Sequence, residues 1–184
     1  MPFPIAHGLL GASIVVAASP QPIRANRAGL ARLTLGALLG ILPDLDYIGV
    51  WFLNVDEIWH RGFSHSLLVA IAVGSLLALW DTKGSRLRWA VVYSAAMASH
   101  GLLDALVSVK SGVALLWPLT SHRFAAGLLE YPDTINVKYY ASADLLAIRD
   151  VFQLLRFGAI ELVIMGGVLI LTLIVRSSFI ARAN

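Results

Sequence analysis

One pair of residues has the type and the spacing of a metal-binding motif. His100 and Asp104 are four positions apart in a run that is otherwise small and apolar. On a helix, residues four apart lie on one face, so both side chains point to the same spot. This spacing suits two ligands of one metal ion, or one ligand and a carboxylate that bridges two ions. A hydrogen-bonded pair that fixes helix packing is the alternative interpretation.

A second group of candidate residues lies at the entrance of an apolar segment. His60 and His65 flank Arg61 and Ser64. We expect Ser64 to cap a helix that begins at His65, so that His65 faces the interior. Arg61 has a planar guanidinium that can hold a phosphate through two hydrogen bonds. A basic cluster that touches lipid headgroups is the alternative.

The remaining candidates lie at the ends of apolar segments or in a loop. Asp44 and Asp46 follow Pro43, where a carboxylate either points into a bundle or caps a helix end. His7 taken alone is typical of a core histidine, and His122 taken alone is typical of a surface loop. Together the predicted metal ligands are His7, Asp44, Asp46, His60, His65, His100, Asp104 and His122.

The donor atoms narrow the choice of metal. The chain has no cysteine, so a site would consist of histidine, carboxylate and water. Such ligands suit Zn²⁺, and also manganese or iron. Because the set is larger than one tetrahedral ion needs, we expect two or three ions. Such a site generates hydroxide from bound water and stabilises the oxygens of a phosphoester during displacement.

The elements that must position these residues are apolar helices. Hydrophobic residues make up 58% of the chain and charged residues 14%, against about 45–50% and 25% in soluble domains. Segments that approach the roughly 20 residues of a membrane span cover 3–19, 30–42, 65–80, 89–109 and 157–175, the second with an extension through 47–53. The sequence therefore predicts one domain, residues 1–184, with an all-α polytopic membrane helix bundle of about five spans.

The links between the segments predict the orientation. Arginine and lysine are concentrated in the short links 20–27 and 81–88 and after the last span, which the positive-inside rule places in the cytoplasm. All histidines then lie on the outer side. A long outer loop, 110–156, is expected to contain short helices, one of them an amphipathic interfacial helix over 142–156. The basic residues form no single patch, so nucleic acid is not an expected partner.

The order of the motifs resembles a known family. His7, the Asp44/Asp46 pair, His60-x4-His65 and His100-x3-Asp104 resemble the YdjM-like family of bacterial inner-membrane, metal-dependent hydrolases, over residues 7–122. That family is distantly similar to zinc-dependent phospholipase C and related single-strand nucleases. The resemblance implies that Asp104 bridges two zinc ions and that His7 serves a third. It also implies that one of the two aspartates and one of the paired histidines complete the set.

These observations predict a membrane-bound metal-dependent hydrolase. We expect a phosphoesterase of the phospholipase or lipid-phosphatase type, acting on a membrane lipid at the outer face of a bacterial or archaeal inner membrane. The predicted catalytic residues are Asp104, His65 and Arg61, with Arg123 as a second cation for the phosphate. A lipid amidase or acyl hydrolase and a non-enzymatic metal transporter are the alternatives. Ligands gathered on one side, rather than at mid-membrane, disfavour the transporter.

Overall fold

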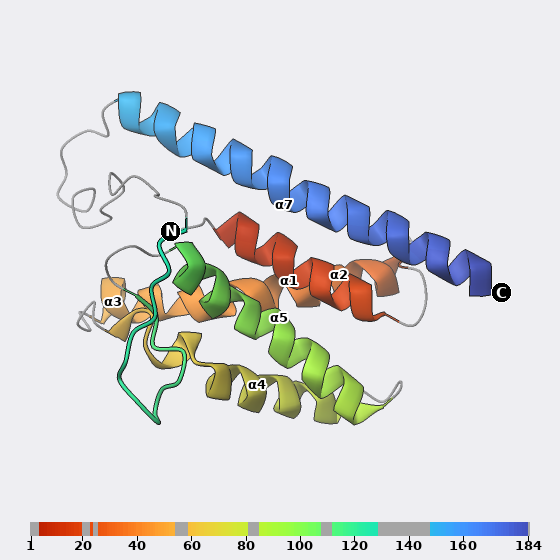
Figure 1. Cartoon of the computed structure of the whole chain (residues 1–184), viewed down its shortest axis with the longest axis horizontal. Coiled ribbons are helices and arrows are strands. Elements are labelled where there is room, and N and C mark those ends of the chain that lie inside the picture. The colour runs from red at the N-terminus through yellow and green to blue at the C-terminus, as the bar shows by residue number, and fades with distance from the viewer. Residues whose placement is uncertain are drawn as a thin grey trace.

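The computed structural model describes residues 4–19, 23, 26–53, 59–80, 85–107, 112–128 and 148–183. Within these ranges the regular structure is helical, apart from a single antiparallel bridge between Val113 and Phe124. The longer helices are α1 (Pro4–Ala18), α2 (Arg27–Ile41), α4 (Leu67–Trp80), α5 (Arg86–Val107) and α7 (Ile148–Ala183). The all-α helix bundle is therefore confirmed (Figure 1).

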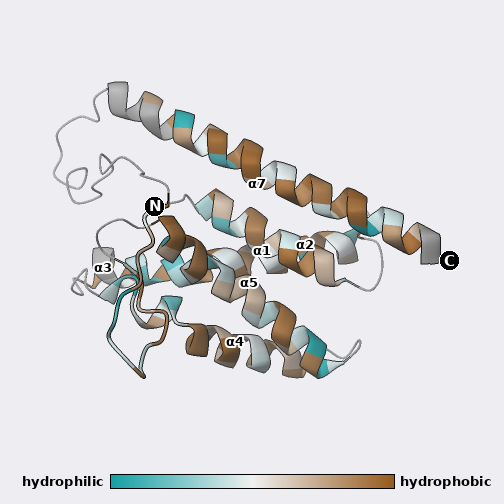
Figure 2. Ribbon diagram, viewed as in Figure 1, coloured by the Kyte–Doolittle hydropathy of each residue, from teal (hydrophilic) through white to brown (hydrophobic). Residues whose placement is uncertain are grey.

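Among the described residues, three helical stretches are long and apolar enough to cross a membrane, namely Arg27–Gly49, Arg86–Val107 and Leu155–Ala181. The helices α1 and α4 are also apolar (Figure 2), but they have only 15 and 14 residues. At 1.5 Å per residue they extend for about 20 Å, against about 30 Å for the hydrocarbon core. We expected about five spans. Three stretches are long enough to cross the membrane, and two shorter apolar helices, α1 and α4, accompany them.

The segment after α2 changes its helix type at a proline. The 3-10 turn η1 (Leu42–Asp46) follows α2 directly and leads into the short helix α3 (Tyr47–Phe52). Pro43 stands at the start of η1 and has no N–H to continue the α-helical ladder. The predicted extension of this span is therefore helical, and the tighter turn carries Asp44 and Asp46.

The last helix differs from the prediction. An interfacial helix over 142–156 and a separate span from 157 were expected, but α7 runs without a break for 36 residues. No proline or glycine between 148 and 157 interrupts it. Residues 142–147 lie outside the described residues. The described part of the long loop, 112–128, contains no helix, so the short helices expected there are absent from that stretch.

Glycines let α1 and α2 approach closely. Gly36 and Gly40 are four positions apart on α2, and a Cβ on Gly36 would come within 2.8 Å of the Cα of Ala12. A Cβ on Gly40 would overlap the carbonyl oxygen of His7. Small residues at this spacing are typical of close helix contacts in membranes. The contact sets His7 beside the end of α2.

Two arginines hold the other end of α1. Arg88 of α5 donates to the carbonyl oxygen of Ala18. Arg176 of α7 donates to the carbonyl oxygen of Ser19 through Nε at 2.9 Å and Nη2 at 2.6 Å. The last carbonyl groups of a helix have no donor within the helix, so these contacts satisfy them. The apolar core that includes Val15, Leu39 and Trp89 fills the bundle between the two ends.

Candidate metal centre

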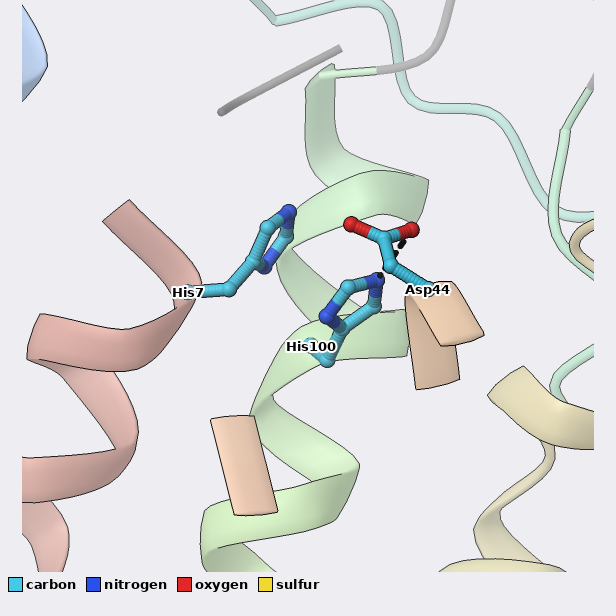
Figure 3. Close-up of side chains that lie close together, drawn as sticks. All are labelled: His7, Asp44 and His100. Carbon is cyan, nitrogen blue, oxygen red and sulfur yellow. Dashed lines mark ion pairs between the residues drawn. The ribbon is translucent and has the colours of Figure 1, made fainter. Parts of the chain in front are cut away.

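Residues from four separate segments meet at the end of the bundle where α1 begins. His7 lies in the first turn of α1, Asp44 in η1, and His65 in a second 3-10 turn, η3 (Phe63–His65). His100 and Asp104 lie in the last two turns of α5. His7, His65, His100 and Asp104 are fully buried. Figure 3 shows His7, Asp44 and His100 pointing toward one another from three elements.

Four ligand atoms, here called the inner cluster, are His65 Nε2, His100 Nε2, Asp44 Oδ1 and Asp104 Oδ2. The two Nε2 atoms are 3.1 Å apart. The Asp44 oxygen lies 3.4 Å from His100 Nε2 and 3.9 Å from His65 Nε2, and the Asp104 oxygen lies 3.7 Å from His65 Nε2. Zinc bonds of 2.0–2.1 Å place neighbouring tetrahedral ligands about 3.3 Å apart. The separations between the histidines and each carboxylate therefore fit ligands of a shared ion.

The hydrogen bonds of the two central histidines fix where their protons are. His100 Nδ1 lies 2.7 Å from the carbonyl oxygen of Gly40, which can only accept, so Nδ1 carries the proton. The Ser64 hydroxyl donates to Asp46 Oδ2 at 2.6 Å. The Ser64 oxygen is then left to accept from His65 Nδ1, 2.9 Å away. In the neutral rings both Nε2 atoms are therefore bare acceptors.

Two bare Nε2 atoms facing each other at 3.1 Å would repel. A cation between them removes that repulsion. A proton would join only two atoms, whereas the inner cluster also brings up two carboxylate oxygens. Burial, and after it the neighbouring His100, lower the pKa of His65 well below its usual value. The neutral ring that results is the form that binds a metal ion.

Asp104 faces two ways. Its Oδ2 points to His65 and lies 3.2 Å from Arg61 Nε, while its Oδ1 lies 3.4 Å from His7 Nε2. The His7 ring stacks on the His100 ring with centroids 3.7 Å apart. The Asp104 carboxylate therefore lies between His65 on one side and His7 on the other. Arg61 is thus paired with the carboxylate instead of facing open solvent.

His60 and Asp46 form a separate pair beside the inner cluster. His60 Nδ1 lies 2.8 Å from Asp46 Oδ1, and the ring packs on Tyr47. The predicted cap by Ser64 is wrong, because its hydroxyl is engaged with Asp46. Ser66 takes that place, since its oxygen accepts from the N–H of Leu68 at 3.2 Å.

Buried polar atoms support the metal interpretation. Among the described residues, both His7 nitrogens, His60 Nε2, Asp44 Oδ1 and both Asp104 oxygens are buried with no hydrogen-bond partner. Such atoms are costly unless a ligand satisfies them. Three overlapping groups of possible ligands follow from the geometry: His7, Asp44 and His100; Asp44, His60 and His65; His65, His100 and Asp104. Their number is compatible with more than one ion.

His122 is not brought to this cluster. Its side chain is exposed and its ring contacts Phe124, and it belongs to none of the three groups found in the described part of the chain. We therefore leave it out of the ligand set. Arg123, the second predicted phosphate partner, donates to the carbonyl oxygen of Gly112.

The backbone of 112–128, here called the strap, runs over the site end of the bundle. The strap accepts a hydrogen bond from Ser66, whose hydroxyl lies 2.5 Å from the carbonyl oxygen of Trp117. Its Ala114 N–H donates to the carbonyl oxygen of Arg61 at 3.0 Å. These bonds hold the loop that carries Arg61 and His65, a role that the sequence does not reveal.

Fold and cluster together define an α-helical membrane protein with a buried histidine–aspartate centre. The chain belongs to the YdjM inner membrane protein family, whose model matches residues 1–183. It is also similar to the inner membrane protein YbcI of Escherichia coli (strain K12), with 36% identity over 102 residues.

The match to YbcI covers 51% of this chain and 57% of the relative. The aligned region is therefore little more than half the length of the curated relative. No solved structure matches the chain. Both descriptions name a location in the inner membrane and no reaction, so the likeness to zinc-dependent phospholipase C stays a prediction from the sequence.

Proposed function

We propose that this protein is a membrane-bound, metal-dependent hydrolase, most specifically a phosphoesterase that acts on a lipid. The observation that carries the proposal is the inner cluster, in which two bare imidazole nitrogens face each other with two carboxylate oxygens beside them. Zn²⁺ fits the nitrogen and oxygen donors, and Mn²⁺ is the alternative. A bound divalent ion supplies activated water and stabilises developing negative charge.

The chain's own residues have distinct roles in this proposal. Asp44, His65, His100 and Asp104 would hold the first ion. Asp104 turns its second oxygen toward His7, so these two residues would contribute to the site of a second ion. Arg61 contacts Asp104 through Nε, and we assign its guanidinium to the phosphate of the substrate. Such a charge-assisted contact is strongest for a planar, bidentate donor.

The surroundings of Asp44 support a lipid substrate. Its side chain is 11% exposed, more than those of its buried partners in the inner cluster. The segment that follows presents exposed apolar side chains, namely Leu45, Ile48, Phe52 and Leu53. A lipid can approach Asp44 along this apolar segment without leaving the bilayer, whereas a soluble polar substrate would gain nothing from such an approach.

The test compares His100→Ala with His122→Ala. We expect wild-type protein to contain tightly bound metal and to release phosphate or a phosphorylated headgroup from vesicles of mixed phospholipids. His100→Ala should lose at least one equivalent of metal and nearly all hydrolysis. His122→Ala is the matched control, because it removes the same residue type from an exposed position.

The outcomes discriminate between the chemical alternatives. Released fatty acid in place of headgroup would identify an acyl hydrolase or amidase. Full activity in a chelator, or in folded His100→Ala protein, would exclude the metal-dependent reaction. Metal binding without hydrolysis, together with metal flux into proteoliposomes, would favour a transporter.

A further inference from the structure

Asp46 was predicted to be a metal ligand, but both of its oxygens are engaged elsewhere. Oδ1 accepts from His60 Nδ1 at 2.8 Å and Oδ2 accepts from the Ser64 hydroxyl at 2.6 Å. Asp46 is absent from all three ligand groups of the described residues. Asp44, two positions earlier, belongs to two of those groups and has a buried Oδ1 without a hydrogen bond.

We propose that Asp46 and Ser64 form a relay that sets the tautomers of two histidines and so determines the metal affinity of the centre. Neither residue touches the ion in this proposal, and both act through the rings that they hold. The inference rests on the proposed metal centre and deepens it, because it assigns two positioning residues to that centre.

The first branch of the relay acts on His60. A carboxylate can only accept, so the contact with Asp46 Oδ1 requires the proton of the neutral His60 ring to be on Nδ1. His60 Nε2 is then a bare acceptor, and it is buried with no hydrogen-bond partner among the described atoms. An imidazole held by a carboxylate in this way is also more basic toward a metal ion.

The second branch acts on His65 through Ser64. The hydroxyl has one proton, which it donates to Asp46 Oδ2. Its oxygen must then accept from His65 Nδ1, and this leaves His65 Nε2 free to face His100. One carboxylate therefore orients two imidazoles, the first directly and the second through a hydroxyl. The pairing joins residues 18 positions apart, Asp46 in η1 and Ser64 in η3.

The decisive measurement is the tautomer of each histidine in metal-free protein, read from imidazole ¹⁵N chemical shifts. Wild-type His60 and His65 should both carry the proton on Nδ1. Ser64→Ala should shift His65 toward the Nε2–H form and leave His60 unchanged. Asp46→Asn should disturb both rings, because an amide cannot accept from both partners. Ser13→Ala is the matched control, since among the described residues its hydroxyl donates to the carbonyl oxygen of Leu9 within α1.

Zinc titration gives the second readout. Asp46→Asn and Ser64→Ala should bind the same number of ions as wild type, with affinity 10- to 100-fold lower, which is the usual effect of removing a partner behind a metal-bound histidine. Ser64→Thr keeps the hydroxyl and should restore most of the affinity. Asp44→Asn should instead lose an equivalent of metal.

Two results would overturn the relay. One is a set of tautomers that does not respond to Ser64→Ala or Asp46→Asn. The other is loss of a metal equivalent in Asp46→Asn, which would make Asp46 a ligand. The tautomer measurement needs neither metal nor substrate. Its result would therefore stand even if the hydrolase proposal failed, and the two failures can be told apart.

Discussion

Arg61 occupies an unusual position in the centre. Its φ angle is 60°, in the left-handed region that costs a non-glycine residue about 1–2 kcal/mol. Its Nε lies 3.2 Å from Asp104 Oδ2, and both side chains are buried. The strained backbone thus places a cation beside the carboxylate that a metal ion would also neutralise. In metal-free protein Arg61 compensates the charge of Asp104.

This role predicts a stability effect that depends on metal. Arg61→Gln leaves Asp104 as a buried carboxylate without its arginine partner, a change that costs about 3–5 kcal/mol in comparable cases. We expect the unfolding temperature of metal-free Arg61→Gln to fall clearly below that of wild type. Added Zn²⁺ should narrow the difference, because the ion supplies positive charge at the same carboxylate.

The control for Arg61→Gln is Arg86→Gln, which removes an exposed arginine at the other end of the bundle. Its unfolding temperature should stay near that of wild type. An Arg61→Gln deficit of equal size with and without Zn²⁺ would show that the pair is structural and unrelated to metal.

At the scale of the elements, the apolar segments were located closely from the sequence. The predicted segments 3–19 and 89–109 correspond to α1 (Pro4–Ala18) and α5 (Arg86–Val107), because a continuous apolar run marks a helix that faces lipid or core. The ends were less predictable. Ser64 and Ser66 are both good caps by type, and only the contact of Ser64 with Asp46 decides between them.

The candidate site was predictable only in part. The four-residue spacing of His100 and Asp104 places both on α5, where both are buried. The separate roles of Asp44 and Asp46 could not be predicted from the sequence, because both side chains are carboxylates. The two residues differ only in the direction in which the 3-10 turn points each side chain. His122 shows the opposite problem, because residue type alone does not tell a ligand from an exposed loop histidine.

The glycine contact between α1 and α2 predicts a linked effect on packing and on the site. Gly40→Ala would place a methyl group against the carbonyl oxygen of His7, and Gly40 also accepts the proton of His100. We expect a loss of about 1–3 kcal/mol in stability, as for other overpacked positions, together with weaker zinc binding. Thermal unfolding in detergent and zinc titration would measure the two effects.

Gly166→Ala provides the comparison for Gly40→Ala. Gly166 lies in α7 with open space where a Cβ would be, so alanine should be neutral or stabilising by up to about 1 kcal/mol. If Gly40→Ala and Gly166→Ala had the same unfolding temperature and the same zinc affinity, the close approach of α1 and α2 at Gly40 would be contradicted.

At the scale of the whole molecule, the two ends of the bundle differ in chemistry. The histidine–aspartate centre lies at one end, and Arg88 and Arg176 lie at the other, where they bond to the carbonyl groups that end α1. The positive-inside rule predicts that the arginine end faces the cytoplasm. The metal centre would then open toward the outer face.

The absence of cysteine makes this orientation directly testable by labelling. Leu119 lies in the strap and Leu87 near the start of α5, and each is 76% exposed. We expect a membrane-impermeant maleimide to label Leu119→Cys in intact cells and Leu87→Cys only after the membrane is opened. The reverse pattern would place the metal centre on the cytoplasmic side.

The arginine contacts at the end of α1 also bear on how the protein is assembled during synthesis. The carbonyl oxygen of Ser19 receives its donors from Arg176, a residue 157 positions later in the chain. Until α7 has left the ribosome, the carbonyl oxygens at the end of α1 must accept hydrogen bonds from water or lipid headgroups. The first described helix can therefore reach its final bonding only after α7 has been inserted beside it.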